Sequence, residues 1–386
     1  MTGTPGPTGD PASTTRQPSQ MAGEGRRENR WVRAVPGRLL IEQGPVPVPA
    51  SGQALVASTL VGVCGSDLHA VAGHHPFVPL PYRPGHEVVG VVSALSGGVR
   101  DAPSAGAAAG FGPARVQVGD RVLLEPNLHC GGCKQCRAGR LNLCEQLDFF
   151  GCTHPQGGMA RWFTVRTDRL HVLSADLSDE QAALVEPLAT PVHAVRLASG
   201  ARAGERADLS GRTVAVLGAG TIGLLVLAAV RWAGASRVVV TDVLASKRER
   251  ARRLGADDVI DAAAPDAVQQ ARNALGESAD VVFDCVGVQS TTDQGIAMAL
   301  KGGTVVVVGV PATPVTVPLP EIQDCQVRLQ GSATYTSDDY AVAMSMIAAG
   351  AVDPANMITM VVPLEEVEQA FTAASSGEHV KVLVRP

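Results

Sequence analysis

The chain has 386 residues, 45% of them hydrophobic, and a formal net charge of -5. This length and apolar content allow more than one domain with substantial cores. Because there is no basic excess to hold phosphate backbones, we expect no nucleic-acid partner. No apolar run reaches the roughly 20 residues of a membrane span, and no hydrophobic signal segment opens the sequence. We therefore expect no membrane partner and a cytoplasmic protein with reduced cysteines.

The first 29 residues are rich in Pro, Gly, Ser, Thr and charge. Such a composition does not repay the entropy of ordering, so residues 1–29 are predicted to be a disordered tail. A second low-complexity segment, RDAPSAGAAAGFGPA at 100–114, is predicted to be a surface loop insertion. Neither segment is expected to carry chemistry.

Between these segments, short β-branched runs such as ALVASTLVGV and HEVVGVVSAL predict strands. Potential metal ligands lie at their ends: Cys64 in GVCGSDLH, and His86 and Glu87 in PGHEVVG. Glu186 follows later, in VEPLAT. One thiolate, one imidazole and one carboxylate leave a fourth position open for water or substrate, as a catalytic zinc requires. The sequence leaves open which glutamate ligates, and each residue alone also fits a purely structural role.

Four cysteines lie close together in CGGCKQCRAGRLNLC: Cys130, Cys133, Cys136 and Cys144. Four thiolates saturate a tetrahedral zinc and leave no position for substrate, so this second site is predicted to be structural. A disulfide pair or a cluster of buried thiols is the alternative explanation. Three further cysteines, Cys152, Cys285 and Cys325, lie outside the expected zinc ligands and are assigned no role.

From Thr213 onward the pattern changes to strands alternating with longer helical segments, which predicts a parallel sheet with crossover helices. The expected strands are TVAVLG from Thr213, RVVVTD from Arg237, DVVFDC from Asp280 and TVVVVG from Thr304. After Gly331, the helical pattern of DDYAVAMSMIAAG and a closing strand, VKVLVRP, suggest that the chain returns to its first domain.

A dinucleotide fingerprint lies where the first of these strands runs into GAGTIG. Gly218 permits the tight turn, Gly220 lets a pyrophosphate approach the backbone, and Gly223 lets the helix pack close to the strand. The phosphates are expected at the N-terminus of that helix, at Thr221 and Ile222.

Asp242 ends the next strand. Its carboxylate can accept hydrogen bonds from ribose hydroxyls and would repel a 2′-phosphate, so NAD is favoured over NADP. Lys247 and Arg248 follow within one helical turn and could soften this preference, although a basic start to a solvated helix also explains them.

These motifs, GVCGSDLH, GHE, the four cysteines, EPLAT and GAGTIG, occur in the order and at spacings similar to those of the zinc-dependent alcohol dehydrogenases of the medium-chain dehydrogenase/reductase superfamily. The resemblance covers about residue 31 to the C-terminus. It implies an α/β protein in which a Rossmann doubly wound parallel-sheet domain is inserted into a GroES-like β-rich catalytic domain. The implied divisions are 30–190, with the structural zinc lobe, 191–332 for the NAD-binding domain, and 333–386 for the return.

The resemblance also implies roles for individual residues. Cys64, His86 and one of the two glutamates would hold a catalytic zinc, with a second, structural zinc in the four-cysteine lobe. Ser66 would take the alcohol proton and pass it by way of the nicotinamide ribose to His69, and Asp67 would orient His86. Residues lining the nicotinamide pocket would be Thr190, Gly309 and Val310.

The implied reaction moves a hydride between a secondary alcohol, belonging to a vicinal diol, a polyol or an amino alcohol, and NAD and gives the ketone. Glu186 stands where the ethanol branch of the family has a second cysteine, so the chain resembles the polyol, threonine and butanediol branch more closely. Thr334 stands where sorbitol-type enzymes place a substrate-binding arginine, which weakens a sorbitol assignment. The expected partner is a small alcohol or ketone, and family members commonly form homodimers or homotetramers.

Three other interpretations remain. A zinc-ribbon binding module would leave GAGTIG and GVCGSDLH unexplained. A non-catalytic binding or structural protein with this fold would be expected to lose zinc ligands or relay groups, and all are present. A zinc-free quinone or enoyl reductase is disfavoured by Cys64, His86 and the four-cysteine lobe together.

Overall fold

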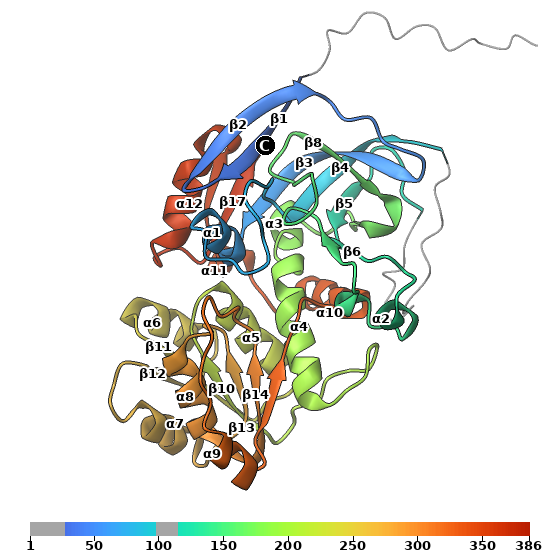
Figure 1. The fold of residues 1–386 in the computed structure, drawn as a ribbon. Coiled ribbons are helices and arrows are strands. Elements are labelled where there is room, and N and C mark those ends of the chain that lie inside the picture. Colours follow the sequence, from blue (N-terminus) through green and yellow to red (C-terminus); the bar gives the residue numbers. More distant parts are fainter. Residues whose placement is uncertain (1–27, 98–114) are drawn as a thin grey trace, which may run out of the picture.

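The computed structural model describes residues 28–97 and 115–386. A β-rich part and an α/β part lie one above the other, and the long helix α4 (Val185–Ser199) runs between them (Figure 1). The predicted loop insertion at 100–114 and residues 1–27 of the predicted tail lie outside the described residues. Within the described ranges, no helix has the length and apolar character needed to cross a membrane.

The β-rich part is built on a seven-stranded sheet with the order β16-β17-β3-β4-β5-β9, and β8 pairs with β3. Its strands are β3 (Gln53–Val63), β4 (Glu87–Leu95), β5 (Arg121–Leu124), β8 (Trp162–Arg166), β9 (Leu170–Val172), β16 (Ile358–Pro363) and β17 (Lys381–Arg385). Smaller pieces of this part are β6 (Asn127–Leu128), β7 (Asp148–Phe149), α1 (Gly65–Val71), α2 (Lys134–Arg137), α3 (Asp179–Ala182), α11 (Pro354–Met357), α12 (Val367–Ser375), and the 3-10 turns η1 (Leu141–Leu143), η2 (Thr167–Arg169) and η3 (Leu364–Glu366).

The expected strands ALVASTLVGV and HEVVGVVSAL are confirmed as parts of β3 and β4, which pair antiparallel. Along β3, buried and half-exposed residues alternate as far as Leu60, and every residue from there to Val63 is buried. A strand with one solvated face shows the first pattern, and a strand covered on both faces shows the second. Cys64 follows directly, so the chain delivers it to a covered end of the sheet.

The predicted tail reaches too far into the chain. Glu28 and Asn29 belong to β1 (Glu28–Val35), which forms an antiparallel hairpin with β2 (Arg38–Pro45). Asn29 is buried, and its side-chain amide donates to the Trp162 carbonyl and accepts from the Trp162 N–H, at 2.8 and 3.0 Å. These two hydrogen bonds order a polar residue that composition alone had assigned to the tail.

The α/β part is a six-stranded parallel sheet with the order β12-β11-β10-β13-β14-β15. Its strands are β10 (Thr213–Leu217), β11 (Arg237–Asp242), β12 (Asp258–Asp261), β13 (Ala279–Asp284), β14 (Ala299–Val307) and β15 (Arg328–Gly331). The four strands expected from sequence are confirmed, while β12 and β15 were not foreseen. The connecting helices are α5 (Thr221–Trp232), α6 (Ala245–Arg253), α7 (Ala267–Leu275), α8 (Gln289–Met298) and α9 (Leu319–Asp324).

Alternate residues of the central strands enter different cores, because side chains point to opposite faces of a sheet. Val214 and Val216 of β10 join the core formed with α4 and α5. Ala215 and Leu217 join the core on the other face, with α7 and α8. Helices therefore cover both faces of the sheet, as expected for a parallel sheet with crossover helices.

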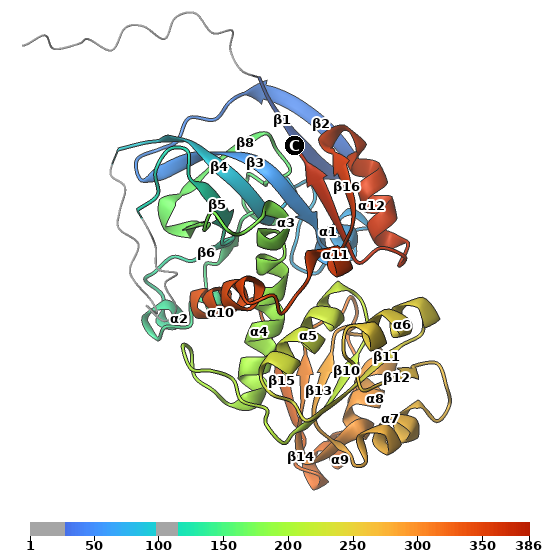
Figure 2. The same cartoon turned by 180° about the vertical axis from the view of Figure 1, so that it is seen from behind.

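The chain then returns to the β-rich part, as expected from its last segments. Helix α10 (Ser337–Ala348) packs against α4, and β17 pairs antiparallel with β3 at the centre of the first sheet (Figure 2). The C-terminal strand therefore lies next to the strand that leads into Cys64.

Candidate active site

The residues predicted to form the open metal site come together where β3 ends and β4 begins. Cys64 is the N-cap of α1, His86 precedes β4 and Glu87 is its first residue. One ligand atom from each of the three lies within 4.8 Å of the other two. Sulfur, nitrogen and carboxylate oxygen are the donors that zinc prefers, so this cluster fits a zinc ion with a position left for another ligand.

Gly62 makes room for the Glu87 side chain. The two residues pair across β3 and β4, and a Cβ at Gly62 would lie 1.6 Å from Glu87 Oε2. Any side chain there would push the carboxylate away. Gly62, the first residue of GVCGSDLH, therefore leaves the space that the Glu87 carboxylate occupies in the cluster.

Lys381, from the C-terminal strand, forms a buried ion pair with Glu87 and donates a hydrogen bond to the Val63 carbonyl at 3.0 Å. Burial opposes the charge on Lys381, but the neighbouring carboxylate of Glu87 and thiol of Cys64 outweigh it and raise the pKa of the lysine. The ammonium offsets negative charge that a thiolate and two carboxylates would otherwise concentrate there. Sequence reasoning missed this residue, which is 294 positions from Glu87.

Glu186 faces the cluster from the first turn of α4 and is buried. Burial raises the pKa of Glu186 to about 7, and the charge of Glu87 adds to the rise while that of His86 opposes it. The Tyr335 hydroxyl donates a hydrogen bond to Glu186 Oε1 at 2.6 Å. The ligand atoms that converge within 4.8 Å include Glu87 and not Glu186, which favours Glu87 as the ligand.

The expected relay residues lie on α1, directly after Cys64. Ser66 is half-buried and His69 is exposed, and residues three apart lie on the same side of a helix. Asp67 is buried and its carboxylate accepts hydrogen bonds from the Tyr82 hydroxyl at 3.0 Å and the Cys64 N–H at 3.1 Å. Its distance to His86 Nδ1 is 3.9 Å, which is too long for a hydrogen bond.

The four cysteines of the closed site also converge, each with its sulfur within 4.8 Å of the others. A tetrahedral zinc with bonds of about 2.3 Å places its sulfurs about 3.8 Å apart. Cys130 and Cys136, and likewise Cys133 and Cys144, are separated by 4.0 Å between sulfurs. These features fit thiolates bound to an ion and no disulfide is formed, since all four are free.

The glycine fingerprint lies at the carboxyl end of β10. Gly218 has a φ of +92°, which favours glycine, and a Cβ on Gly223 would lie 1.8 Å from the Gly218 carbonyl oxygen. Gly220 is different, because its φ of -74° suits any residue and nothing lies within 4 Å of a Cβ built there. The protein itself gives no reason for a glycine at 220, whereas a dinucleotide phosphate lying against the backbone does.

The other expected cofactor residues lie around this strand edge. Asp242 ends β11 and accepts hydrogen bonds from the Ala219 and Leu244 N–H groups at 2.8 and 2.9 Å. Arg248 donates to the Asp242 carbonyl at 2.8 Å and pairs with Asp261 at 3.1 Å. The remaining expected residues are Thr221 and Ile222 at the start of α5, Thr190 on α4, and Gly309 and Val310 after β14. Because parallel strands end at the same edge, β10, β11 and β14 bring the residues that directly follow them to one side of the sheet.

Comparison with known proteins identifies the family of the chain. Residues 50–175 match the model of the alcohol dehydrogenase GroES-like domain, and residues 221–349 match that of the zinc-binding dehydrogenases. D-xylulose reductase A of Aspergillus oryzae is 30% identical over 357 residues, which are 90% of this chain and 93% of that protein. The chain belongs to the zinc-dependent alcohol dehydrogenases of the medium-chain superfamily.

Solved structures of this dehydrogenase family share the whole fold. The 2R,3R-butanediol dehydrogenase of Bacillus subtilis is 28% identical, with 93% of this chain and 99% of that chain covered and a TM-score of 0.80. A Sinorhizobium meliloti protein solved with NADP is 32% identical, with 93% and 100% covered and a TM-score of 0.82. The α/β fold with a GroES-like domain and a Rossmann domain, predicted from the sequence, is confirmed.

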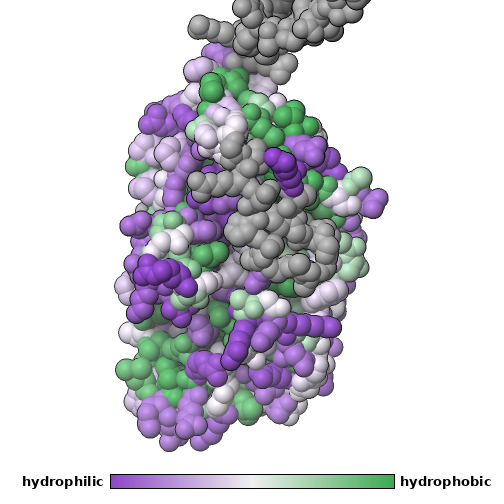
Figure 3. Space-filling view, turned by 90° about the vertical axis from the view of Figure 1, so that its right-hand side faces the viewer, coloured by the Kyte–Doolittle hydropathy of each residue, from purple (hydrophilic) through white to green (hydrophobic). Residues whose placement is uncertain are grey.

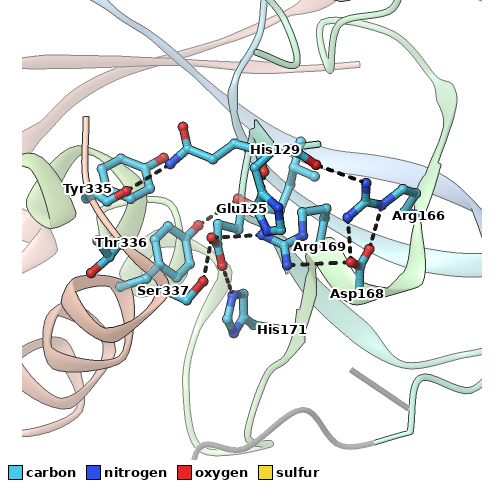
Figure 4. Close-up of polar contacts among 12 residues, drawn as sticks. Glu125, His129, Arg166, Asp168, Arg169, His171, Tyr335, Thr336 and Ser337 are labelled. Carbon is cyan, nitrogen blue, oxygen red and sulfur yellow. Dashed lines mark hydrogen bonds and ion pairs between the residues drawn. The ribbon is translucent and has the colours of Figure 1, made fainter. Parts of the chain in front are cut away.

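A buried polar network fixes the segment that carries Tyr335 in this dehydrogenase (Figure 4). Glu125 accepts hydrogen bonds from Arg169, His171 and Ser337 at 3.1, 2.9 and 2.8 Å. Despite burial, the hydrogen bond and charge of His171 and the charge of Arg169 lower the pKa of Glu125. Ser337 begins α10, so the network ties the start of that helix to β5 and β9 and holds the preceding tyrosine in place.

Asn127 adds a second tie, because its side chain donates to the Tyr335 carbonyl at 3.1 Å. Tyr335 therefore has its backbone held by Asn127 and its hydroxyl on Glu186. Sequence reasoning noted the neighbouring Thr334 and gave Tyr335 no role. A signal was present, since the chain has three tyrosines and two of them, Tyr335 and Tyr340, lie in this segment.

The contrast between two glycines gives a test of the dinucleotide site. Gly220→Val is expected to leave the melting temperature within about 2 °C of the parent, because its side chain meets open space. It should weaken NAD binding at least tenfold, measured by quenching of tryptophan fluorescence or by calorimetry. Gly223→Val is the matched contrast and should fail to fold, since its Cβ would collide with backbone. Unchanged NAD affinity in Gly220→Val would contradict the assignment.

Proposed function

We propose that this dehydrogenase oxidises a secondary alcohol of a polyol or vicinal diol to the ketone, with NAD as hydride acceptor, and catalyses the reverse reaction. The observation that carries the proposal is the ligand set, in which a thiol, an imidazole and a carboxylate converge while a second carboxylate, Glu186, faces them. Support also comes from the named activities of the relatives, which are a D-xylulose reductase and a butanediol dehydrogenase.

In this proposal Cys64, His86 and Glu87 hold a catalytic zinc, and the four-cysteine lobe holds a structural one, giving two per subunit. When bound, the catalytic ion acts as a Lewis acid and favours the alkoxide form of the substrate over the alcohol near neutral pH. Ser66 takes the proton released by the substrate hydroxyl, and His69, exposed on the same helix, delivers it to solvent. Lys381 balances the charge of Glu87, and Tyr335 keeps Glu186 oriented toward the reacting groups.

A substrate panel tests the proposal. NAD reduction is measured with pentitols and hexitols, 2,3-butanediol, threonine and simple secondary alcohols at equal concentrations. We expect kcat/KM to be at least tenfold higher for polyols or vicinal diols than for 2-propanol. Equal or higher values for simple alcohols would contradict the substrate class while leaving the reaction class intact.

The choice of NAD over NADP rests on Asp242, whose carboxylate is held by two backbone N–H groups at the end of β11. Two bases follow on α6, Lys247 and Arg248, and the guanidinium of Arg248 is already engaged by the Asp242 carbonyl and by Asp261. The 2′-phosphate of NADP would lie beside this negatively charged carboxylate and would be repelled by it, and the guanidinium of Arg248 is not free to neutralise the phosphate.

Asp242→Gly is expected to shift the ratio of kcat/KM for NAD to that for NADP by about tenfold or more toward NADP, because it removes a like-charge repulsion of about 1–2 kcal/mol. The ratio is measured with one alcohol at saturating concentration. Glu249→Gly, at an exposed acidic residue further along α6, is the control and should leave the ratio unchanged. If Asp242→Gly also leaves it unchanged, Asp242 does not contact the ribose.

We propose that the enzyme forms homodimers or larger homo-oligomers through the free edge of β15. The exposed apolar side chains include Leu300, Leu319 and Leu329, which lie on or beside the strands β14 and β15 and on α9. Figure 3 shows an apolar patch, bordered by hydrophilic residues, at the lower left of this face, within the α/β part. An unpaired edge strand with apolar neighbours is suited to pairing with a second copy.

We also propose a cytoplasmic location, because thiolate ligands require reduced cysteines.

A further inference from the structure

The ring of His86 must be held in one orientation for its nitrogen to meet an ion. The imidazole is 4% exposed and lies edge-on to Phe149, with ring centroids 5.6 Å apart. A metal-binding histidine ordinarily donates its second N–H to a fixed partner, and this contact sets both the tautomer and the ring angle. In this chain the Nδ1 atom lies nearer to Cys152 Sγ, at 3.6 Å, than to the Asp67 carboxylate, at 3.9 Å.

The carboxylate of Asp67 is engaged elsewhere. One oxygen accepts the Tyr82 hydroxyl and the other accepts the Cys64 N–H, at 3.0 and 3.1 Å. The carboxylate is therefore placed to hold the loop of Cys64, and the sulfur of Cys152 is left as the contact at hydrogen-bond distance for Nδ1.

Cys152 is fixed against His86 by backbone contacts. Its N–H donates to the Phe149 carbonyl at 3.0 Å. The residue before it, Gly151, has a φ of +76°, and a Cβ there would lie 2.4 Å from the carbonyl of Gly85 and 2.8 Å from the His86 nitrogen. The loop of Cys152 thus packs directly on the backbone of the histidine.

A second part of the same loop strengthens this packing. Gly158 donates its N–H to the Gly85 carbonyl at 2.8 Å, and Met159 donates to the Pro84 carbonyl at 3.1 Å. Both segments are close enough that side chains larger than glycine at 85, 151 or 158 would collide with backbone or with Val88. Such close contacts fix the backbone that carries the Cys152 side chain beside the histidine.

We propose that Cys152 is the positioning residue of His86 and that its sulfur accepts the hydrogen bond from Nδ1–H. A proton on Nδ1 leaves Nε2 unprotonated, and an unprotonated nitrogen is what a metal requires. The opposite arrangement, with the thiol donating to Nδ1, would put the proton on Nε2 and prevent ligation. The inference rests on the proposed zinc-ligand role of His86 and adds a residue to which the sequence assigned no role.

Metal affinity of the purified full-length protein tests this inference without relying on turnover. Zinc affinity of the open site is measured by competition with a chromogenic chelator in the parent, Cys152→Ala and Cys152→Ser. Cobalt is then substituted for zinc, and the visible spectrum of the open site is recorded. Cys325→Ala, which removes a half-buried thiol of the α/β part, is the control.

We expect Cys152→Ala to weaken zinc binding at the open site about tenfold or more, the usual loss when such a supporting contact is removed. The cobalt spectrum should shift, kcat should fall, and the KM for NAD should stay the same. Cys152→Ser, whose hydroxyl can also accept a hydrogen bond, should recover part of the affinity. Unchanged zinc affinity and an unchanged cobalt spectrum in Cys152→Ala would overturn the inference.

Two outcomes separate this inference from the proposed function. If the parent protein binds no metal at the open site, the zinc role of His86 is wrong and the inference falls with it. If the parent binds zinc and Cys152→Ala binds it equally well, the proposed function stands and the inference alone is wrong. Should the alanine variant fail to fold, Cys152→Ser carries the same comparison with a smaller expected change, and parental affinity together with a parental cobalt spectrum would again overturn the inference.

Discussion

Replacing Cys64 by serine is expected to lower kcat by about 10³-fold or more. A metal acting as a Lewis acid contributes several kcal/mol to transition-state stabilisation, and each 1.36 kcal/mol is a factor of ten in rate. Serine is a far weaker zinc ligand than a thiolate, so the open site should lose its ion. NAD affinity should change less than about threefold, because the glycine fingerprint lies in the other part of the fold.

Steady-state rates, zinc content and NAD binding are measured on the same preparation. Cys325→Ser serves as the control, because it removes a thiol at the end of α9 that belongs neither to the four-cysteine lobe nor to the open site. Parental activity in Cys64→Ser would show that this residue does not hold the ion. Loss of NAD binding together with activity would instead argue against the separation of the two sites.

Replacing Cys133 by serine is expected to cost stability. The lobe from Cys130 to Cys144 has few apolar residues of its own, so the ion supplies much of the free energy that orders it. Losing about 3 kcal/mol or more should lower the melting temperature by about 5 °C or more. Zinc content should fall by one ion per subunit, while the catalytic site keeps its own ion.

Differential scanning fluorimetry and metal analysis check this result. Lys134→Ser is the matched control, since Lys134 is an exposed neighbour on α2 and is not a ligand. If Cys133→Ser were as stable as the parent and bound as much zinc, the structural role of the lobe would be contradicted.

Local patterns predicted much of this molecule. Strands, crossover helices and the glycine fingerprint depend on neighbours a few positions apart, so β10, α5 and Gly218 were recognisable in the sequence. The residue types at Cys64 and His86 also pointed to a metal site, and the structure brings these two residues together with Glu87.

Contacts between distant segments could not be predicted in the same way. Lys381 reaches Glu87 across 294 positions, and Tyr335 reaches Glu186 across 149. A lysine in a closing strand looks like an ordinary edge residue until the sheet order places that strand beside β3. The pairing of Asn29 with Trp162, which shortened the predicted tail, has the same cause.

The choice between two carboxylates shows where sequence and geometry differ. Glu87 and Glu186 both carry a carboxylate that could bind zinc, and no rule of sequence spacing decides between them. Pairing of Glu87 with Gly62 across two strands brings its oxygen to the ligand cluster, whereas Glu186 approaches from a helix and is held by Tyr335. The strand register therefore favours Glu87 as the proposed ligand, a choice that the sequence left open.

The most direct measurement of the central claim is NAD reduction by the purified protein with a vicinal diol or polyol, before and after zinc is removed with a chelator and again after zinc is returned. Our account predicts that activity is lost on removal and restored by zinc, while NAD stays bound throughout. Turnover that continues in zinc-free protein, or no turnover on any alcohol with both zinc and NAD bound, would contradict it.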